Sequence, residues 1–193
     1  MTSYLPYDIQ SLLPRGGPSV ASLPAHGAPA PSLPGVRFSR PTCVAFVRHC
    51  GCPFAEAEVR SLRDVAQARD DVDIVIITHS EQDVAQEWFK SVGGDDFPQS
   101  RVTLLADSTR ELYAAWGLGA LPLTGLFSWA MVGELRALAS QGIKNRRTGA
   151  GSWRWQNSGG FVVDAAGKVR WHKVATHAGD TVDYAAALKD AGV

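Results

Sequence analysis

Apolar runs and amphipathic segments alternate along the chain from residue 42 onward. The segments 42–47 and 72–78 are short and dominated by apolar and β-branched residues, which is typical of buried strands. The segment 53–68 has apolar residues at helical spacing with charged residues between them. The complete expected series has strands at 42–47, 72–78, 102–106, 160–163 and 169–173, and helices at 53–68, 80–91, 108–116, 126–140 and 181–191.

The order of these elements predicts an α/β fold. Strands that alternate with helices favour a mostly parallel sheet covered on both faces, and the turn residues 164–168 make the last two strands an antiparallel hairpin. This order is compatible with a thioredoxin-like fold. Such a fold would have a central mixed sheet, helices on both faces, and a helix-plus-loop insertion at 126–158 before the C-terminal hairpin. Ser80 is the expected N-cap of the helix 80–91.

The N-terminal segment 1–35 has a different character. Eight of the eleven prolines lie before residue 42, and the segment shows no helical periodicity apart from a short turn at 8–13. We therefore expect a proline-rich N-terminal arm at 1–35 and one thioredoxin-like domain at 36–193. A passive tail is the favoured interpretation of the arm, because terminal residues are usually poorly tied down, and a recognition segment is the alternative.

Composition narrows the functional classes. Lys plus Arg and Asp plus Glu both number 19, so the net charge is zero, and neither nucleic acid nor an acidic lipid surface is expected as the main partner. The chain has no run of 18 apolar residues and no secretory signal, so we expect neither a membrane span nor export. Three cysteines make no disulfide framework, and their odd number fits a reducing compartment. We expect a cytoplasmic protein.

The segment 46–54, with the sequence FVRHCGCPF, places a cysteine where a strand gives way to a helix. Gly51 permits a tight turn, so Cys52 is expected at the helix start. Unpaired N–H groups and the positive end of the helix dipole favour a thiolate there, and Arg48 and a protonated His49 would add to the effect. Cys52 is therefore the candidate nucleophile, and a buried, inert cysteine is the alternative.

The other cysteines are candidates for resolving an oxidised Cys52. Cys50 could pair with Cys52 only through a strained small ring, so it either resolves Cys52 or simply lines the turn. Cys43 begins a buried strand and is expected in the core. Position 55 is alanine, which excludes a Cys-x-x-Cys dithiol. An oxidised Cys52 would therefore need Cys50, Cys43 or an external thiol such as glutathione or thioredoxin.

Three stretches resemble one known family. The turn FVRHCGCPF (46–54) resembles the Phe-x-Arg-His-x-x-Cys turn of the peroxiredoxin-like 2 family, which is related to the alkyl hydroperoxide reductase and thiol-specific antioxidant (AhpC/TSA) proteins. Residues 102–118 are similar to the family's strand and helix after the reactive turn, and residues 159–180 are similar to its closing hairpin. The resemblance covers residues 36–191, and the insertion is most similar to fungal members.

The resemblance implies a thioredoxin fold and an antioxidant, thiol-dependent oxidoreductase that reduces a peroxide or a related small substrate through Cys52. Three departures bear on that activity. Typical peroxiredoxins carry an arginine shortly before the aromatic residue of the hairpin strand, and the nearest position here is Ser158, so the donors that polarise a bound peroxide are not visible in the sequence. Many relatives carry a second cysteine where this chain has Ala55. Typical peroxiredoxins have the motif Pro-x-x-x-Thr/Ser-x-x-Cys in the stretch where Arg48 and His49 stand here. Fold is therefore inherited more safely than activity.

Further site residues are expected near the turn and in the insertion. His49 is a candidate general base for Cys52. Four residues of the insertion are candidates for substrate binding, as an apolar wall with an anion-binding arginine, and core packing is the alternative. Two cysteines with one residue between them do not match the usual spacing of zinc ligands, so we expect no metal. The sequence has no nucleotide-binding glycine motif, so we expect no cofactor. The four insertion residues are Trp153, Arg154, Trp155 and Gln156.

Three functions remain open at this point. The first is the thiol oxidoreductase, which would act on a small-molecule substrate and could use an external thiol as its reductant. A homodimer is one possible oligomeric state of this enzyme. The second is a non-redox enzyme of the same fold that acts on an apolar small molecule in specialised metabolism. The third is a non-catalytic interaction module that uses the proline-rich arm for recognition.

Overall fold

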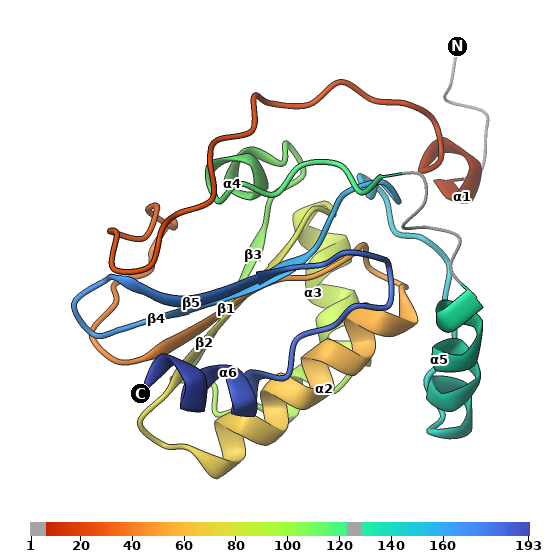
Figure 1. The fold of residues 1–193 in the computed structure, drawn as a ribbon. Helices are drawn as coiled ribbons and strands as arrows, with labels where there is room; N and C mark the ends of the chain where they lie inside the picture. Colours follow the sequence, from red (N-terminus) through yellow and green to blue (C-terminus); the bar gives the residue numbers. More distant parts are fainter. Residues whose placement is uncertain (1–6, 123–128) are drawn as a thin grey trace.

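A five-stranded mixed sheet forms the centre of the molecule. The structure is a computed structural model that describes residues 7–122 and 129–193. The strands are β1 (Thr42–Phe46), β2 (Asp73–Thr78), β3 (Val102–Ala106), β4 (Gly159–Val163) and β5 (Val169–Val174). Their order in the sheet is β3-β2-β1-β4-β5 (Figure 1). β1 pairs in parallel with β2 and antiparallel with β4, so the sheet is mixed, as the sequence predicts.

Helices cover both faces of this sheet, and two further helices, the first and the fifth α-helix of the chain, lie to one side of it (Figure 1). No helix within the described ranges is long and apolar enough to cross a membrane. The helices are α1 (Tyr7–Gln10), α2 (Pro53–Ala68), α3 (Gln82–Ser91), the short 3₁₀ helix η1 (Gly94–Asp96), α4 (Glu111–Ala115), α5 (Trp129–Ser140) and α6 (Tyr184–Ala191). Of the helix expected at 126–140, residues 126–128 lie outside the described residues.

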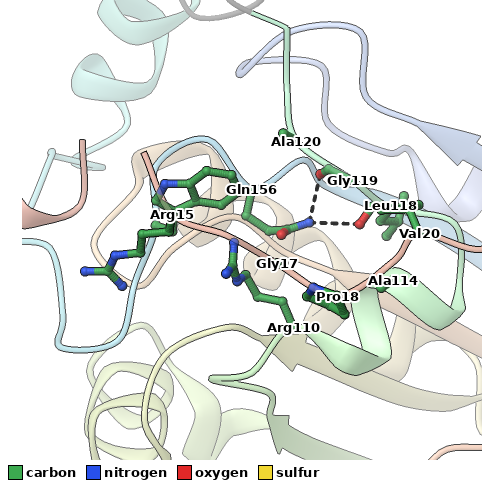
Figure 2. A pocket seen from close by; sticks show the side chains of 11 residues that line it. Arg15, Gly17, Pro18, Val20, Arg110, Ala114, Leu118, Gly119, Ala120 and Gln156 are labelled. Carbon is green, nitrogen blue, oxygen red and sulfur yellow. Dashed lines mark hydrogen bonds between the residues drawn. The ribbon is translucent and has the colours of Figure 1, made fainter. Parts of the chain in front are cut away.

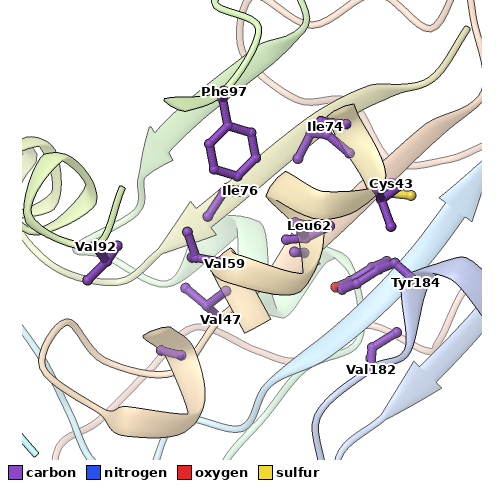
Figure 3. Packing of buried hydrophobic residues seen from close by; sticks show 14 of the residues in the cluster. Cys43, Val47, Val59, Leu62, Ile74, Ile76, Val92, Phe97, Val182 and Tyr184 are labelled. Carbon is purple, nitrogen blue, oxygen red and sulfur yellow. The ribbon is translucent and has the colours of Figure 1, made fainter. Parts of the chain in front are cut away.

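The sheet separates two hydrophobic cores. On one face, Cys43 and Ala45 of β1 pack with buried side chains of α2, α3 and α6, and Figure 3 shows part of this cluster. On the other face, Val44 and Phe46 pack with side chains of α4 and with Leu33 of the N-terminal segment. Successive residues of a strand point to opposite faces, which explains the split. This arrangement confirms the predicted thioredoxin-like α/β fold.

The start of α4 differs from the sequence expectation. The pattern predicts a helix from residue 108, but α4 begins at Glu111. Asp107 accounts for the delay, because its carboxylate accepts hydrogen bonds from the backbone N–H groups of Glu111, Leu112 and Tyr113. Arg110 precedes the helix with a φ of 64°, in the left-handed region that non-glycine residues rarely adopt.

Two other helix boundaries also depend on local side chains. Ser80 was expected to cap α3, but Glu81 occupies the N-cap position, and the Ser80 hydroxyl instead lies 2.7 Å from the Ser152 hydroxyl. The closing helix was expected from residue 181, but α6 begins at Tyr184. Asp183 caps it by accepting a 3.0 Å hydrogen bond from the Ala186 N–H.

The described part of the N-terminal arm lies along the domain (Figure 1). The backbone N–H of Ala30 donates to the Gly167 carbonyl at 2.8 Å, and that of Ala21 donates to the Ala114 carbonyl at 2.9 Å. The arm therefore has contacts that a passive tail would lack. The division into an arm at 1–35 and a domain at 36–193 stays a prediction.

Candidate active site

Cys52 lies at the junction of strand and helix that the sequence predicts. β1 ends at Phe46, a turn follows, and Cys52 is the N-cap residue of α2, with Pro53 as the first helical residue. Gly51 makes the turn possible with a φ of 97°, and a side chain there would collide with the Arg147 carbonyl oxygen. Glycine is thus required at position 51 both by backbone conformation and by space.

Cys52 lies at the amino-terminal end of α2. The first N–H groups of α2 lack partners within the helix, and the helix dipole is positive at this end. The Cys52 side chain makes no capping hydrogen bond in this structure and is only 5% exposed. The nearby Glu56 carboxylate is balanced by Arg60 at 2.6 Å and Arg146 at 3.2 Å. The thiol is therefore placed for activation but covered.

The loop that follows α5 covers the cysteine turn. The Arg146 N–H donates to the Gly51 carbonyl at 3.0 Å, and the Gly149 N–H donates to the Cys50 carbonyl at 3.4 Å. A hollow of about 290 Å³ lies beside the turn. Cys50 lines this hollow together with Arg146, Arg147 and Trp88, whereas Cys52 is not among its lining residues. The hollow therefore reaches Cys50 but not Cys52.

The other two cysteines have different surroundings. The Cys50 sulfur lies 3.3 Å from the Thr78 hydroxyl. Burial raises the pKa of Cys50, and hydrogen bonds from Ser80 and Thr78 partly offset that effect. Cys43 is fully buried in the core, and burial raises its pKa to about 12. Cys43 is therefore a core residue, as expected, and its thiol stays protonated.

Arg48 and His49 are buried on the same turn as Cys52. Arg48 donates one hydrogen bond, from Nη2 to the Arg154 carbonyl at 2.9 Å. Its Nε and Nη1 have no hydrogen-bond partner among the described residues. His49 directs Nδ1 to the Cys50 carbonyl at 3.2 Å. The structure thus brings both residues to the turn, and their action on the Cys52 sulfur stays a prediction.

His79 is a buried residue that the sequence did not single out as catalytic. It follows β2, and its Nε2 lies 3.0 Å from the Trp153 carbonyl. Burial lowers the pKa of His79 well below 6.5, and the electrostatic effects of His49 and Arg48 lower it further, whereas the hydrogen bond to the Trp153 carbonyl opposes them. His79 is therefore a neutral, buried partner behind the turn. Its place directly after a strand was the available signal.

Three of the four insertion residues proposed for substrate binding bond to the N-terminal arm, and the fourth bonds to the segment after α4. The Trp153 and Trp155 indole N–H groups donate to the carbonyls of Leu13 and Leu12 at 3.0 and 2.9 Å. Arg154 donates from Nε to the Ser11 hydroxyl at 3.1 Å. Gln156 donates to the backbone carbonyls of Leu118 and Gly119. These contacts tie the insertion to the arm, and a role in substrate binding stays a prediction.

No group of three or more potential metal ligands occurs among the residues that the structure describes.

The family can now be assigned from the chain as a whole. The model of one protein family, described as AhpC/TSA antioxidant enzyme, matches residues 60–177. The chain belongs to this family. The match covers more than half of the sequence but begins after Cys52, so it supports the family without testing the reactive residue. The family assignment confirms the expected function class, a thiol-dependent oxidoreductase of the peroxiredoxin-like type.

Solved structures show the same fold at low sequence identity. A peroxiredoxin-like protein from Aquifex aeolicus is 13% identical with a TM-score of 0.59, covering 90% of this chain and 89% of the other. Peroxidoxin BcpB from Mycobacterium tuberculosis is 19% identical with a TM-score of 0.55, covering 91% and 95%. A thiol peroxidase from Chromobacterium violaceum is 15% identical with a TM-score of 0.55, covering 89% and 88%. No curated protein matches the sequence.

Proposed function

We propose that Cys52 is the peroxidatic residue of this AhpC/TSA family member and that it reduces a peroxide or a related small substrate. The observation that supports this most directly is the position of Cys52 as the N-cap residue of α2, a helix of 16 residues. The unpaired N–H groups and the dipole of such a helix stabilise a thiolate, which is the nucleophilic form of cysteine. The buried donors of Arg48 would stabilise negative charge that develops on the substrate.

The chemical step is a two-electron transfer. The Cys52 thiolate attacks one oxygen of the peroxide, and an S–O bond forms as the O–O bond breaks. The other oxygen leaves as water or an alcohol after it takes up a proton. The sulfur is oxidised to a sulfenic acid, and the peroxide is reduced.

A second thiol must then resolve the sulfenic acid, with loss of water and formation of a disulfide. Cys43 is poorly placed, because it lies near the start of β1 and the cysteine turn follows its end. Four strand residues alone span about 13 Å, whereas a disulfide needs Cα atoms roughly 4.4–6.8 Å apart. Cys50 or an external thiol is therefore the resolving partner in our proposal, and the hollow beside Cys50 supports access at that point.

The proposal extends to the reductant and the setting. Glutathione or thioredoxin would supply the electrons that return the disulfide to thiols. All three cysteines are free in the structure, which supports a reducing compartment such as the cytoplasm. A homodimer stays a prediction, and light scattering of the purified chain would test it.

Three single substitutions test the assignment. We expect Cys52→Ser to lower hydroperoxide turnover by at least about a hundredfold, because the attacking sulfur is removed. Cys43→Ser should leave turnover unchanged and serves as the matched control for loss of a buried thiol. Trapping of the sulfenic acid with dimedone, followed by site-resolved mass spectrometry, should label residue 52 in the wild-type chain. Unchanged turnover in Cys52→Ser would sink the proposal.

Cys50→Ser separates the two steps. If Cys50 resolves Cys52, the variant should still form the sulfenic acid, and the dimedone adduct should accumulate until an external thiol is added. If an external thiol resolves Cys52 directly, Cys50→Ser should turn over like the wild-type chain. Either result identifies the resolving thiol without affecting the assignment of Cys52.

A further inference from the structure

A second hollow lies between the N-terminal arm and the domain, and none of the three cysteines lines it. Its volume is about 220 Å³, and Figure 2 shows its lining side chains. Arm residues form one wall, and the start of α4, the segment after it and the insertion form the others. The lining residues are Arg15, Gly17, Pro18, Val20, Arg110, Ala114, Leu118, Gly119, Ala120, Trp153 and Gln156.

Two arginines give this hollow a positive charge that its lining does not balance. Neither Asp nor Glu is among the lining residues. Burial and the like charge of Arg15 both lower the pKa of Arg110, so the two guanidinium groups repel each other. The negative charge of Asp107 raises the pKa of Arg110 and so opposes this effect. The Asp107 carboxylate, however, already accepts hydrogen bonds from three backbone N–H groups of α4. A bound anion would relieve the repulsion.

Arg110 is fixed in place despite its backbone strain. It is the one described non-glycine residue with a positive φ, at 64°. Its guanidinium lies over the Trp153 ring at 4.5 Å, and Nη2 donates to the Gly16 carbonyl. A left-handed conformation in a non-glycine residue is strained and persists only where the surroundings impose it. Arg110 is therefore pre-organised at the wall of the hollow.

Arg15 is held only weakly. It is exposed, and its two hydrogen bonds to the carbonyls of Gly151 and Gln10 are long, at 3.3 and 3.5 Å. Its guanidinium can therefore turn toward a ligand at small cost. In Figure 2, the Arg15 and Arg110 side chains lie on one side of the hollow and Val20 and Leu118 on the other. The hollow thus has a cationic end and an apolar end.

We propose that this hollow binds a small organic anion, with its carboxylate held between Arg15 and Arg110 and a short apolar body against Pro18, Val20 and Leu118. Arginine suits this ligand because its planar N–H donors match both carboxylate oxygens. The apolar wall and the modest volume select a compact hydrocarbon body over a bare inorganic ion. The site does not depend on the reactivity of Cys52, so its test is independent of peroxide turnover.

Isothermal titration of the full chain tests the site with three probes: sodium hexanoate, hexanol and inorganic phosphate. We expect hexanoate to bind one site with a dissociation constant on the order of 1 mM, which is typical of a ligand this small. Hexanol lacks the carboxylate and should show no measurable binding. Phosphate lacks the apolar body and should bind more weakly than hexanoate.

Matched arginine variants locate the site. Arg15→Gln should weaken hexanoate binding about tenfold, because it removes charge-assisted hydrogen bonds. Arg136→Gln, on the exposed surface of α5, should bind like the wild-type chain. Because the Arg15 side chain is exposed, its variant should also melt at the wild-type temperature. No hexanoate binding to the wild-type chain, or equal binding to both variants, would overturn the proposal. Tighter binding of phosphate than of hexanoate would overturn the proposed ligand class.

Discussion

Glu58 lies on α2 with its carboxyl group buried in the core, where the Tyr184 hydroxyl donates to it at 3.0 Å. Burial raises the pKa of Glu58 to about 8, and the hydrogen bond from Tyr184 and the charge of Lys173 oppose that change only in part. The folded chain therefore holds Glu58 as a neutral acid at pH 7. The unfolded chain ionises the same residue near its ordinary pKa of 4.5.

This difference predicts a stability that falls as the pH rises. The contribution of Glu58 is fully present below about pH 4.5, declines between about pH 4.5 and 8, and is lost above that range. The full difference amounts to about 5 kcal/mol in the free energy of unfolding. Urea unfolding at a series of pH values would measure it.

Glu58→Gln isolates this effect from other titrations. The amide accepts the Tyr184 hydrogen bond and cannot ionise, so the decline between pH 4.5 and 8 should disappear. Glu87→Gln, at an exposed position on α3, should keep the wild-type decline. The same pH dependence in all three proteins would show that Glu58 does not cause it.

At the scale of elements, the start of α4 depends on one carboxylate. Asp107 is buried and accepts from three backbone N–H groups at 2.8–3.1 Å. We expect Asp107→Ala to lower the free energy of unfolding by about 2 kcal/mol, at the upper end of capping effects. Asp183→Ala removes the single capping bond of α6 and should cost about 1 kcal/mol. Denaturant unfolding of both variants would measure the two losses. A loss for Asp107→Ala that is no larger than the loss for Asp183→Ala would contradict the prediction.

Strands and long helices were predictable because their residues repeat a simple spacing. The apolar run at 72–78 became β2, and the helical pattern at 53–68 became α2 without change of bounds. The boundaries of α3, α4 and α6 were displaced because side chains at their starts have specific partners. The Ser80 hydroxyl, for example, bonds to Ser152, a residue 72 positions away, and no local pattern contains that information.

The candidate site was predictable only where it is local. Cys52, Gly51 and Pro53 are neighbours in sequence, so the junction of strand and helix could be read from the order of residues. The loop around Arg146 and Gly149, almost a hundred positions later, lies against this turn. Its hydrogen bonds to the turn depend on the path of the chain after α5, which spacing does not determine.

At the scale of the whole molecule, the arm and the insertion hold each other in place. Hydrogen bonds join residues 11–15 to residues 151–155, including the Arg154 N–H to the Ser11 carbonyl at 3.0 Å. Deleting residues 1–16 should therefore speed amide hydrogen exchange in residues 146–156 by about tenfold. These contacts reduce the population of the open loop, from which exchange takes place.

Hydrogen exchange read by mass spectrometry contains its own control for this deletion. Peptides that cover β4 and β5 should exchange at the wild-type rate, because the arm contacts around Ala30 remain in the shortened chain. Faster exchange everywhere would indicate general destabilisation. Unchanged exchange in residues 146–156 would show that the arm does not hold the insertion.

The 5% exposure of Cys52 has a kinetic consequence. A covered thiol reacts only during the intervals in which its cover is displaced. At low concentrations of an electrophile, the rate should rise with concentration, and at high concentrations it should reach a plateau. The height of that plateau is the frequency with which the cover opens, so it should be the same for a small peroxide and for a bulky alkylating reagent. The barrier that limits the fastest turnover would then belong to the chain around the sulfur and not to the chemistry of the sulfur itself.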